Sequence, residues 1–374
     1  VVPVLYGLFG YAIPLLPVVP LATVRERALA VPARVMGAWT APFAALAALQ
    51  MRYGSEFLVA YAVCVALGLA ALSRLLARRL GTLGSRAAVA SVAALSLLPG
   101  VLVIHVPALR ATAAALTSPA APGDPALRLP VGSLVRFSQE VARVTPETGG
   151  YLDGSPAPAY GILVEPAIGH TLMHVARRPT PAGNFGRFVG ERNYDATQRF
   201  YTAASEDEAL AIVDALRSPY VVTSEVGPPG PGAKQILHDA DGRAPDGSRW
   251  TRFRLVTEGP AGGRPLADLF GMPARPGLPP YKLFERVAGA VLEVPAPPQS
   301  RVTAQVVVRT PTDRRFVYRV EERAGADGLA RLRIPYATQT QAPARPLGPW
   351  RVERPGSEPV EVRVSDSEVR DGAT

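Results

Sequence analysis

Hydrophobic and polar positions divide this chain at about residue 115. Before that point Ala, Leu, Val and Pro follow one another almost without interruption, and Glu26 and Glu56 are the only carboxylates. Four apolar segments have the length of about 20 residues that crosses a bilayer. They are residues 1–23, 28–50, 57–76 and 87–106. The pattern predicts a helical transmembrane bundle over residues 1–115, followed by folded extracytoplasmic domains.

Basic residues predict the orientation of these spans. Arg74, Arg78, Arg79 and Arg86 lie between the third and fourth segments, and clustered arginines mark cytoplasmic loops. The fourth segment then leads outward, so we expect the rest of the chain outside. Because the Ala, Arg and Pro usage is typical of bacteria, we expect a multi-pass protein of the bacterial cytoplasmic membrane. Its C-terminal domains would lie on the periplasmic or extracellular side.

Two arginines depart from this topology pattern. Arg52, in the sequence QMRYGSEF, falls at the external interface, where its guanidinium fork suits a phosphate group. The alternative is an interfacial side chain that pairs with Glu56 at i+4. Arg34 lies near the middle of the second segment, where facing lipid costs about 2.5 to 3.5 kcal/mol. We therefore expect Arg34 to face a helix bundle or an aqueous edge.

Residues 116–280 carry the pattern of an α/β domain. The predicted elements are, in order, a helix at 132–144, a strand at 161–164, a helix at 169–178, a helix within 193–217, a strand at 220–224 and a helical turn at 266–270. Ser205 followed by Glu208 is a capping-box sequence. Residues 236–256 are polar and show no definite pattern. The strand, helix and loop between 161 and 186 converge, which is how a strand end presents a binding edge.

From residue 281 onward the hydrophobic period changes to two. Seven short strands are predicted, at residues 281–287, 288–294, 301–309, 315–321, 329–334, 350–354 and 360–364. Gly and Pro turns separate them. A small β-sandwich over residues 281–374 is therefore expected, as the third part of a multi-domain membrane protein.

Composition excludes several classes of function. The formal net charge is +9, but no basic run alternates with aromatic residues, so we expect no nucleic acid partner. Cys64 is the only cysteine and lies in an apolar segment, which excludes an internal disulfide framework. The chain begins Val-Val without Met, which we interpret as a cut point in a longer protein.

One predicted helix carries a candidate metal site. His170 and His174 are spaced i, i+4 on one face, as zinc ligands can be. Glu165 is near in sequence, but a third ligand is not evident, and helix packing is the alternative that we favour. We expect no metal held by this chain. From the residues alone, the chain is a membrane-anchored extracytoplasmic protein without visible catalytic chemistry.

Short motifs in a fixed order carry a family resemblance. The central stretch contains GH at 169–170, RRP at 177–179, NFG at 184–186 and YVV at 220–222. It resembles the catalytic-subunit family of oligosaccharyltransferases, bacterial and archaeal branch, at the region of the Trp-Trp-Asp signature. QMRY at 50–53, KLFERVAGAVL, RIPYAT and VSDSEVRDG are similar to further segments of that family. The resemblance covers the whole chain, as the C-terminal portion of a longer protein.

The resemblance implies a C-type glycosyltransferase fold. The family transfers a glycan from a polyprenyl (pyro)phosphate lipid to an acceptor side chain, Asn in known members. The implied partners are a lipid-linked oligosaccharide, an acceptor polypeptide and membrane lipid. A divalent metal, Mg or Mn, is implied for the complete enzyme, on carboxylates of N-terminal loops that this chain does not contain. We therefore expect no catalytic residue in this chain.

The resemblance also assigns candidate site residues. Arg52 matches the arginine that contacts the lipid-linked pyrophosphate. Glu165, Pro166 and Ala167 occupy the Trp-Trp-Asp positions, which bind the hydroxyl of the acceptor, and they lie with Gly169 and His170 on the acceptor side. This is also where the sequence departs from the family.

The departure leaves three hypotheses open. Pro166 has no indole and Ala167 cannot accept a hydrogen bond, so an acceptor hydroxyl would go unpaired at about 1 to 3 kcal/mol. The first hypothesis is an oligosaccharyltransferase-like enzyme with divergent acceptor recognition. The alternative is a non-catalytic, membrane-anchored periplasmic binding protein derived from that family. A third is transfer to another acceptor, such as a lipid or polysaccharide.

Overall fold

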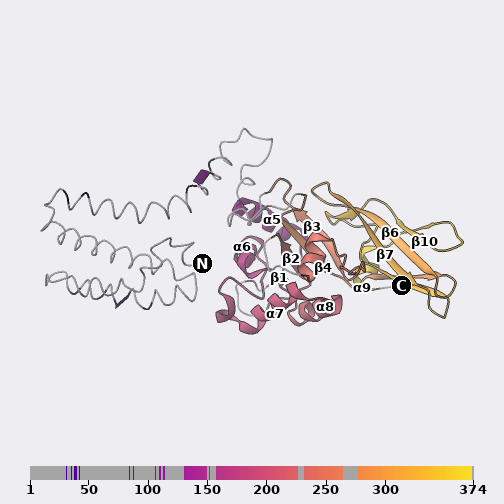
Figure 1. Ribbon diagram of the computed structural model, residues 1–374, viewed down its shortest axis with the longest axis horizontal. Helices are drawn as coiled ribbons and strands as arrows, with labels where there is room; N and C mark the ends of the chain where they lie inside the picture. Colours follow the sequence, from indigo (N-terminus) through magenta and orange to yellow (C-terminus); the bar gives the residue numbers. More distant parts are fainter. Residues whose placement is uncertain are drawn as a thin grey trace. The chain divides into compact units, whose positions relative to one another are not determined.

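The computed structural model describes residues 130–149, 151, 157–225, 231–263 and 277–372, with isolated positions between 31 and 113. The chain divides into two compact units, Val1–Thr117 and Ser118–Thr374; the second is drawn in colour over most of its length in Figure 1. Within the described part of the chain, no helix has the length and apolarity needed to cross a membrane. The four predicted spans fall almost wholly outside that part.

A four-stranded sheet forms the centre of the second unit. Its order is β1 (Ile162–Leu163), β2 (Tyr220–Ser224), β4 (Tyr281–Arg286) and β3 (Phe253–Gly259). β1 is parallel to β2, whereas β4 is antiparallel to both β2 and β3. The strands at 161–164 and 220–224 are thus confirmed. All five residues of β2 are buried, because helices or further strands cover both faces of the sheet.

One face of this sheet is covered by α5 (Pro130–Val144) and α6 (Pro166–Ala176), close to the helices predicted from the sequence. Phe137 of α5 stacks on Tyr281 of β4, with ring centroids 5.2 Å apart. Both rings belong to a buried apolar cluster that also includes Leu172 of α6. The helix positions follow from the spacing of their apolar residues.

The opposite face is covered by three further helical segments. They are α7 (Glu191–Thr202), α8 (Glu206–Ala215) and the single π-helical turn η6 (Gln235–Asp239). A fourth, η5 (Gly186–Val189), packs against one of them, α7. Ser205 caps α8, since its side chain accepts from the Glu208 backbone N–H at 3.3 Å. The Glu208 carboxylate accepts from Ala204 instead of Ser205, so the predicted capping box is half formed.

The C-terminal part is rich in β-structure (Figure 1). One sheet has the order β11-β10-β6-β7 with β9 paired to β6, and β5 pairs with β8. Their bounds are β5 Ala290–Pro295, β6 Arg301–Arg309, β7 Arg315–Arg323, β8 Leu329–Ile334, β9 Arg345–Pro346, β10 Trp350–Glu353 and β11 Val360–Val362. The predicted alternation holds over the second half of β6, where Val306 and Val308 are buried and Val307 is exposed. In the first half Thr303 is buried as well as Val302.

One prediction for this region needs correction. Residues 281–287 were expected as the first sandwich strand, but β4 lies in the α/β sheet between β2 and β3. An alternation of hydrophobic and polar residues predicts a strand but does not determine which sheet the strand joins. Residues 236–256, which showed no pattern, contain most of η6 and the start of β3. A single apolar cluster runs from Phe200 through Phe284 to Trp350, so the α/β and β-rich parts share one core.

The described chain ends in a short capped helix, α9 (Asp366–Asp371). Ser365 and Glu368 form a complete capping box: Glu368 N–H donates to Ser365 Oγ at 3.3 Å, and Ser365 N–H donates to Glu368 Oε2 at 2.6 Å. The box satisfies backbone donors that the first turn would otherwise leave unpaired. It fixes Asp366 at the start of the helix, where this side chain contacts the sheet.

Candidate functional site

The candidate site lies where β1 ends and α6 begins. Glu165 is the last residue before the helix, with φ −55° and ψ 130°, and Pro166 occupies the first helical position. Proline is favoured there because the N–H at the first helical position has no acceptor within the helix, so no hydrogen bond is lost when it is missing. β1 and β2 are parallel, so their carboxyl ends meet at one edge of the sheet, the edge at which α/β folds bind ligands. Glu165 and Ser224 therefore come together although they are far apart in sequence.

The Glu165 carboxyl is buried, with 5% of the residue exposed. Ser224 Oγ donates to its Oε2 at 2.6 Å, while its Oε1 has no hydrogen-bond partner among the described residues. Burial raises the pKa of Glu165 to about 7, although the Ser224 hydrogen bond and the charge of Lys234 act to lower it. Near neutral pH this buried carboxyl can thus accept a proton or release one.

The π-helical turn η6 supplies further polar groups at this sheet edge. Lys234 precedes it and is 6% exposed, and its Nζ donates to the backbone oxygen of Glu225 at 3.4 Å. Fully buried His238 places its Nδ1 2.9 Å from Thr223 Oγ1 of β2. Single π-turns are frequent at functional sites. Lys234 and His238 were not predicted as site residues. Their signal in the sequence is weak: two ionisable residues that flank the apolar pair Ile236 and Leu237.

The other predicted residues line the first turns of α6. Pro166 and Gly169 are buried, Ala167 is exposed and His170 is half-buried. A Cβ on Gly169 would lie 3.0 Å from the Ala182 backbone oxygen, so glycine permits close packing of α6 on the following loop. Pro166 and Ala167 offer no side-chain hydrogen bond, as expected from their chemistry.

The two histidines are not brought together as a metal site. The His170 ring packs against Phe185 of the NFG motif, with centroids 5.2 Å apart, and His174 is exposed. Within the described ranges there is no group of three His, Cys, Asp or Glu that could hold a metal ion. Arg52, the predicted pyrophosphate contact, and Arg34 lie outside the described residues, so their roles stay predictions.

Arg178 of the RRP motif has a structural role that the sequence did not indicate. It is 5% exposed, and its guanidinium donates to the Thr145 backbone oxygen at 2.9 Å and to the Ala142 backbone oxygen at 3.2 Å, both at the end of α5. It also donates to the Ala176 oxygen of α6 at 3.0 Å. One cation thus satisfies carbonyls at two helix C-termini, where positive charge is favoured. It positions α6, and with it the candidate site.

Comparison with known proteins gives this geometry a context. Residues 289–374 match the family model described as the archaeal glycosylation protein B long peripheral domain. No curated protein sequence matches the chain. Among solved structures, the chain is similar to the Archaeoglobus fulgidus oligosaccharyltransferase in complex with Zn and sulfate. The TM-score is 0.64 at 16% identity, covering 99% of this chain and 59% of that chain.

Two further structures from the same organism give the same result. Oligosaccharyltransferase AglB in complex with an inhibitory peptide and a dolichol-phosphate matches with a TM-score of 0.65 and 16% identity, over 99% of this chain and 56% of that chain. The enzyme tethered with an acceptor peptide containing the NVT sequon matches with a TM-score of 0.63 and 16% identity, over 100% of this chain and 58% of that chain.

The chain has the fold of the C-terminal portion of an archaeal oligosaccharyltransferase and spans less than two thirds of the length of these structures. The resemblance to the oligosaccharyltransferase catalytic-subunit family, over its C-terminal portion, is thereby confirmed. The matched relatives are archaeal, whereas the bacterial origin expected from residue usage stays a prediction.

Proposed function

We propose that this chain forms the acceptor-side, C-terminal portion of an oligosaccharyltransferase-like membrane glycosyltransferase. The protein transfers a glycan from a polyprenyl (pyro)phosphate lipid to a protein acceptor on the external side of the membrane. The observation that carries the proposal is the fold, which matches an oligosaccharyltransferase over 99% of this chain. The peripheral-domain match over residues 289–374 supports it independently.

Acceptor recognition in this protein differs from the Trp-Trp-Asp pattern. Ala167 is exposed at the first turn of α6 and presents a methyl group, so it cannot accept the hydrogen bond of an acceptor hydroxyl. An unpaired hydroxyl costs about 1 to 3 kcal/mol, which removes most of the advantage of Ser or Thr in the acceptor. The Glu165 carboxyl does not replace this hydrogen bond, because it is buried and Ser224 donates to it at 2.6 Å.

The metal of the complete enzyme is not assigned to this chain. A divalent metal is implied by the resemblance, and one related structure is a complex with Zn. The described residues contain no group of three potential ligands and so do not fit such an ion. What they do fit is acceptor positioning by the first turn of α6 and the end of β2.

Arg52 provides a direct test of donor binding. We assign it to the pyrophosphate of the lipid-linked oligosaccharide, because a guanidinium fork suits phosphate oxygens. Membranes containing the protein are assayed with a labelled lipid-linked oligosaccharide and an acceptor peptide. Arg52→Ala is expected to reduce transfer roughly tenfold or more at limiting donor and less at saturating donor. Arg78→Ala, in the predicted cytoplasmic cluster, is the matched control, and equal activity of both variants would remove Arg52 from the site.

The second candidate is a non-catalytic binding protein of the same family. The side chains of Pro166 and Ala167, which offer no hydrogen bond to an acceptor, favour it. This candidate function predicts that the protein binds peptide or glycan but transfers no glycan, even when donor and divalent metal are saturating. Transfer to a lipid or polysaccharide is the third candidate, and glycan appearing in the lipid or polysaccharide fraction instead of the peptide would identify it.

A further inference from the structure

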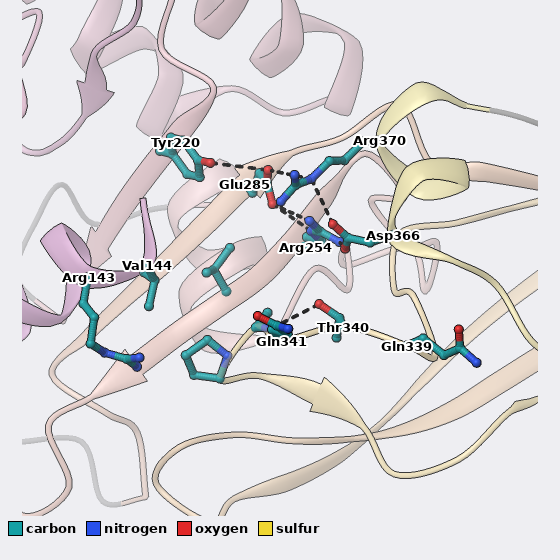
Figure 2. A pocket seen from close by; sticks show the side chains of 13 residues that line it. Arg143, Val144, Tyr220, Arg254, Glu285, Gln339, Thr340, Gln341, Asp366 and Arg370 are labelled. Atoms are coloured by element: carbon teal, nitrogen blue, oxygen red, sulfur yellow. Dashed lines mark hydrogen bonds and ion pairs between the residues drawn. The ribbon is translucent and has the colours of Figure 1, made fainter. Parts of the chain in front are cut away.

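A polar cavity lies away from the candidate site (Figure 2). Its volume is about 740 Å³, within the range of about 300 to 1,000 Å³ of small-molecule sites. The end of α5, strands β2, β3 and β4, the segment at 339–343 and helix α9 form its walls. Residues 165–170 do not line it, so it is separate from the start of α6.

Ion pairs fix one wall of this cavity. Arg254 is 4% exposed, and it donates to Glu285 Oε2 through Nε at 2.8 Å and Nη2 at 2.6 Å. Its Nη1 donates to Asp366 Oδ1 at 2.6 Å. Figure 2 shows Tyr220, Glu285, Arg254, Asp366 and Arg370 grouped on this side. Both ends of Arg254 are held, so the wall is rigid before a ligand arrives, which lowers the entropic cost of binding.

The charges of the cavity balance one another. Asp366 and Glu285 are paired with Arg254, and Arg370 Nε lies 3.1 Å from Asp366 Oδ2. Arg143 pairs with Glu140 at 2.6 Å. The three lining arginines are matched by the two lining carboxylates together with Glu140, which lies outside the lining. Counted with this partner, the cavity has no excess charge for a phosphate or a carboxylate. Its largely polar lining also does not suit a lipid chain.

Hydrogen-bonding groups remain available on the opposite side. The Gln339 and Gln341 residues are exposed and line the cavity. Within the described ranges, neither side-chain amide group has an intramolecular hydrogen bond. Arg143 uses Nε and Nη2 for Glu140, which leaves Nη1 for a ligand. Figure 2 shows Arg143 extending from α5 toward the segment that carries Gln341. The cavity therefore presents both donors and acceptors without net charge.

We propose that this cavity binds neutral hexose units of a glycan. Hexose hydroxyls both donate and accept hydrogen bonds and carry no charge, which matches two amides, a guanidinium and paired carboxylates. The inference rests on the proposed function, because it assigns a place to part of the glycan in the same protein. The cavity lies off the acceptor edge and would hold sugars that are remote from the transferred bond.

The test is a binding measurement that needs neither donor lipid nor acceptor. The full chain, in a detergent without sugar headgroups, is titrated with neutral trisaccharides of glucose, galactose or mannose, and separately with glucuronate and inorganic phosphate. Saturation-transfer NMR and calorimetry report binding. At least one neutral trisaccharide is expected to bind, and the Gln339→Ala/Gln341→Ala variant is expected to weaken its binding about tenfold or more, the effect of losing about 1.4 kcal/mol.

Gln305→Ala is the matched control, because Gln305 lies on β6 outside the cavity. This variant should bind the trisaccharide as tightly as the unmodified protein does. The inference is overturned if no neutral trisaccharide binds at millimolar concentration, if the double variant binds as well as the control, or if glucuronate or phosphate binds as well as the sugars. Transfer with no sugar binding would refute only this inference, whereas sugar binding without any transfer would refute the proposed enzyme.

Discussion

Burial of the Glu165 carboxyl raises its pKa to about 7 from an ordinary value of 4.5. The folded protein therefore holds this proton at pH values where the unfolded chain has lost it. The stability that comes from the protonated carboxyl is fully present below about pH 4.5 and is lost as the pH rises through 7. Glutamine has the shape of the protonated form and carries no titratable group.

We expect Glu165→Gln to become more stable relative to the unmodified protein as the pH rises from 4.5 to 7. The gain is on the order of 1 to 3 kcal/mol at pH values above this window. Urea unfolding of the full chain at several pH values measures it. Glu147→Gln, at an exposed position, is the control and should leave the pH dependence unchanged. Parallel stability curves for Glu165→Gln and the unmodified protein would contradict the burial of an ionisable group here.

At the scale of elements, most helices and strands follow from local pattern, whereas the site does not. The turn η6 and strand β3 escaped prediction because they bury polar residues, His238 in η6 and Arg254 and Glu258 in β3. The predicted strand β4 also buries a lysine, Lys282. Lys282 is satisfied by Asp241 at 2.7 Å, a pairing across 41 positions that the sequence does not reveal. Glu165 gave no sign of burial for the same reason, since its partner Ser224 reaches it only through parallel strand pairing.

Close packing holds the segment just before η6 against the end of α7. A Cβ on Gly232 would lie 2.8 Å from the Tyr201 backbone oxygen and 2.8 Å from Thr202 Cα, so alanine requires backbone movement. We expect Gly232→Ala to lower the free energy of unfolding by roughly 1 to 3 kcal/mol and to speed hydrogen exchange in η6. Gly348→Ala has nothing within 4 Å of its Cβ and should be near neutral. Equal effects of the two substitutions would show that this contact is not tight.

At the scale of the whole second unit, Arg254 ties the central sheet to the C-terminal helix. It contacts Glu285 of β4 and Asp366 of α9, at 2.6 Å in each case. Removing one member of a buried ion pair leaves an uncompensated charge, at about 3 to 5 kcal/mol. Burial alone would raise the pKa of Asp366, but the hydrogen bond and charge of Arg254 lower it. The α/β and β-rich parts should therefore unfold together.

We expect Arg254→Met to destabilise the chain by roughly 3 to 5 kcal/mol and to expose α9 to hydrogen exchange. Adding Glu285→Gln should cost less in this background than in the unmodified protein, because the pair is already broken. Arg301→Met is the control, since its ion pair with Glu321 lies at the surface. Additive effects of the Arg254 and Glu285 substitutions would show that the two side chains are not coupled.

The central claim is transfer of a glycan with altered acceptor recognition, and its most direct measurement compares two acceptors. Membranes containing the protein are supplied with lipid-linked oligosaccharide and with matched peptides carrying Asn-Val-Thr or Asn-Val-Ala. Because Ala167 cannot bind the hydroxyl, we predict transfer to both peptides at rates within about threefold, less than the tenfold that 1.4 kcal/mol represents. A preference of a hundredfold for the threonine peptide would contradict the altered recognition, and no transfer to either would contradict the transferase itself.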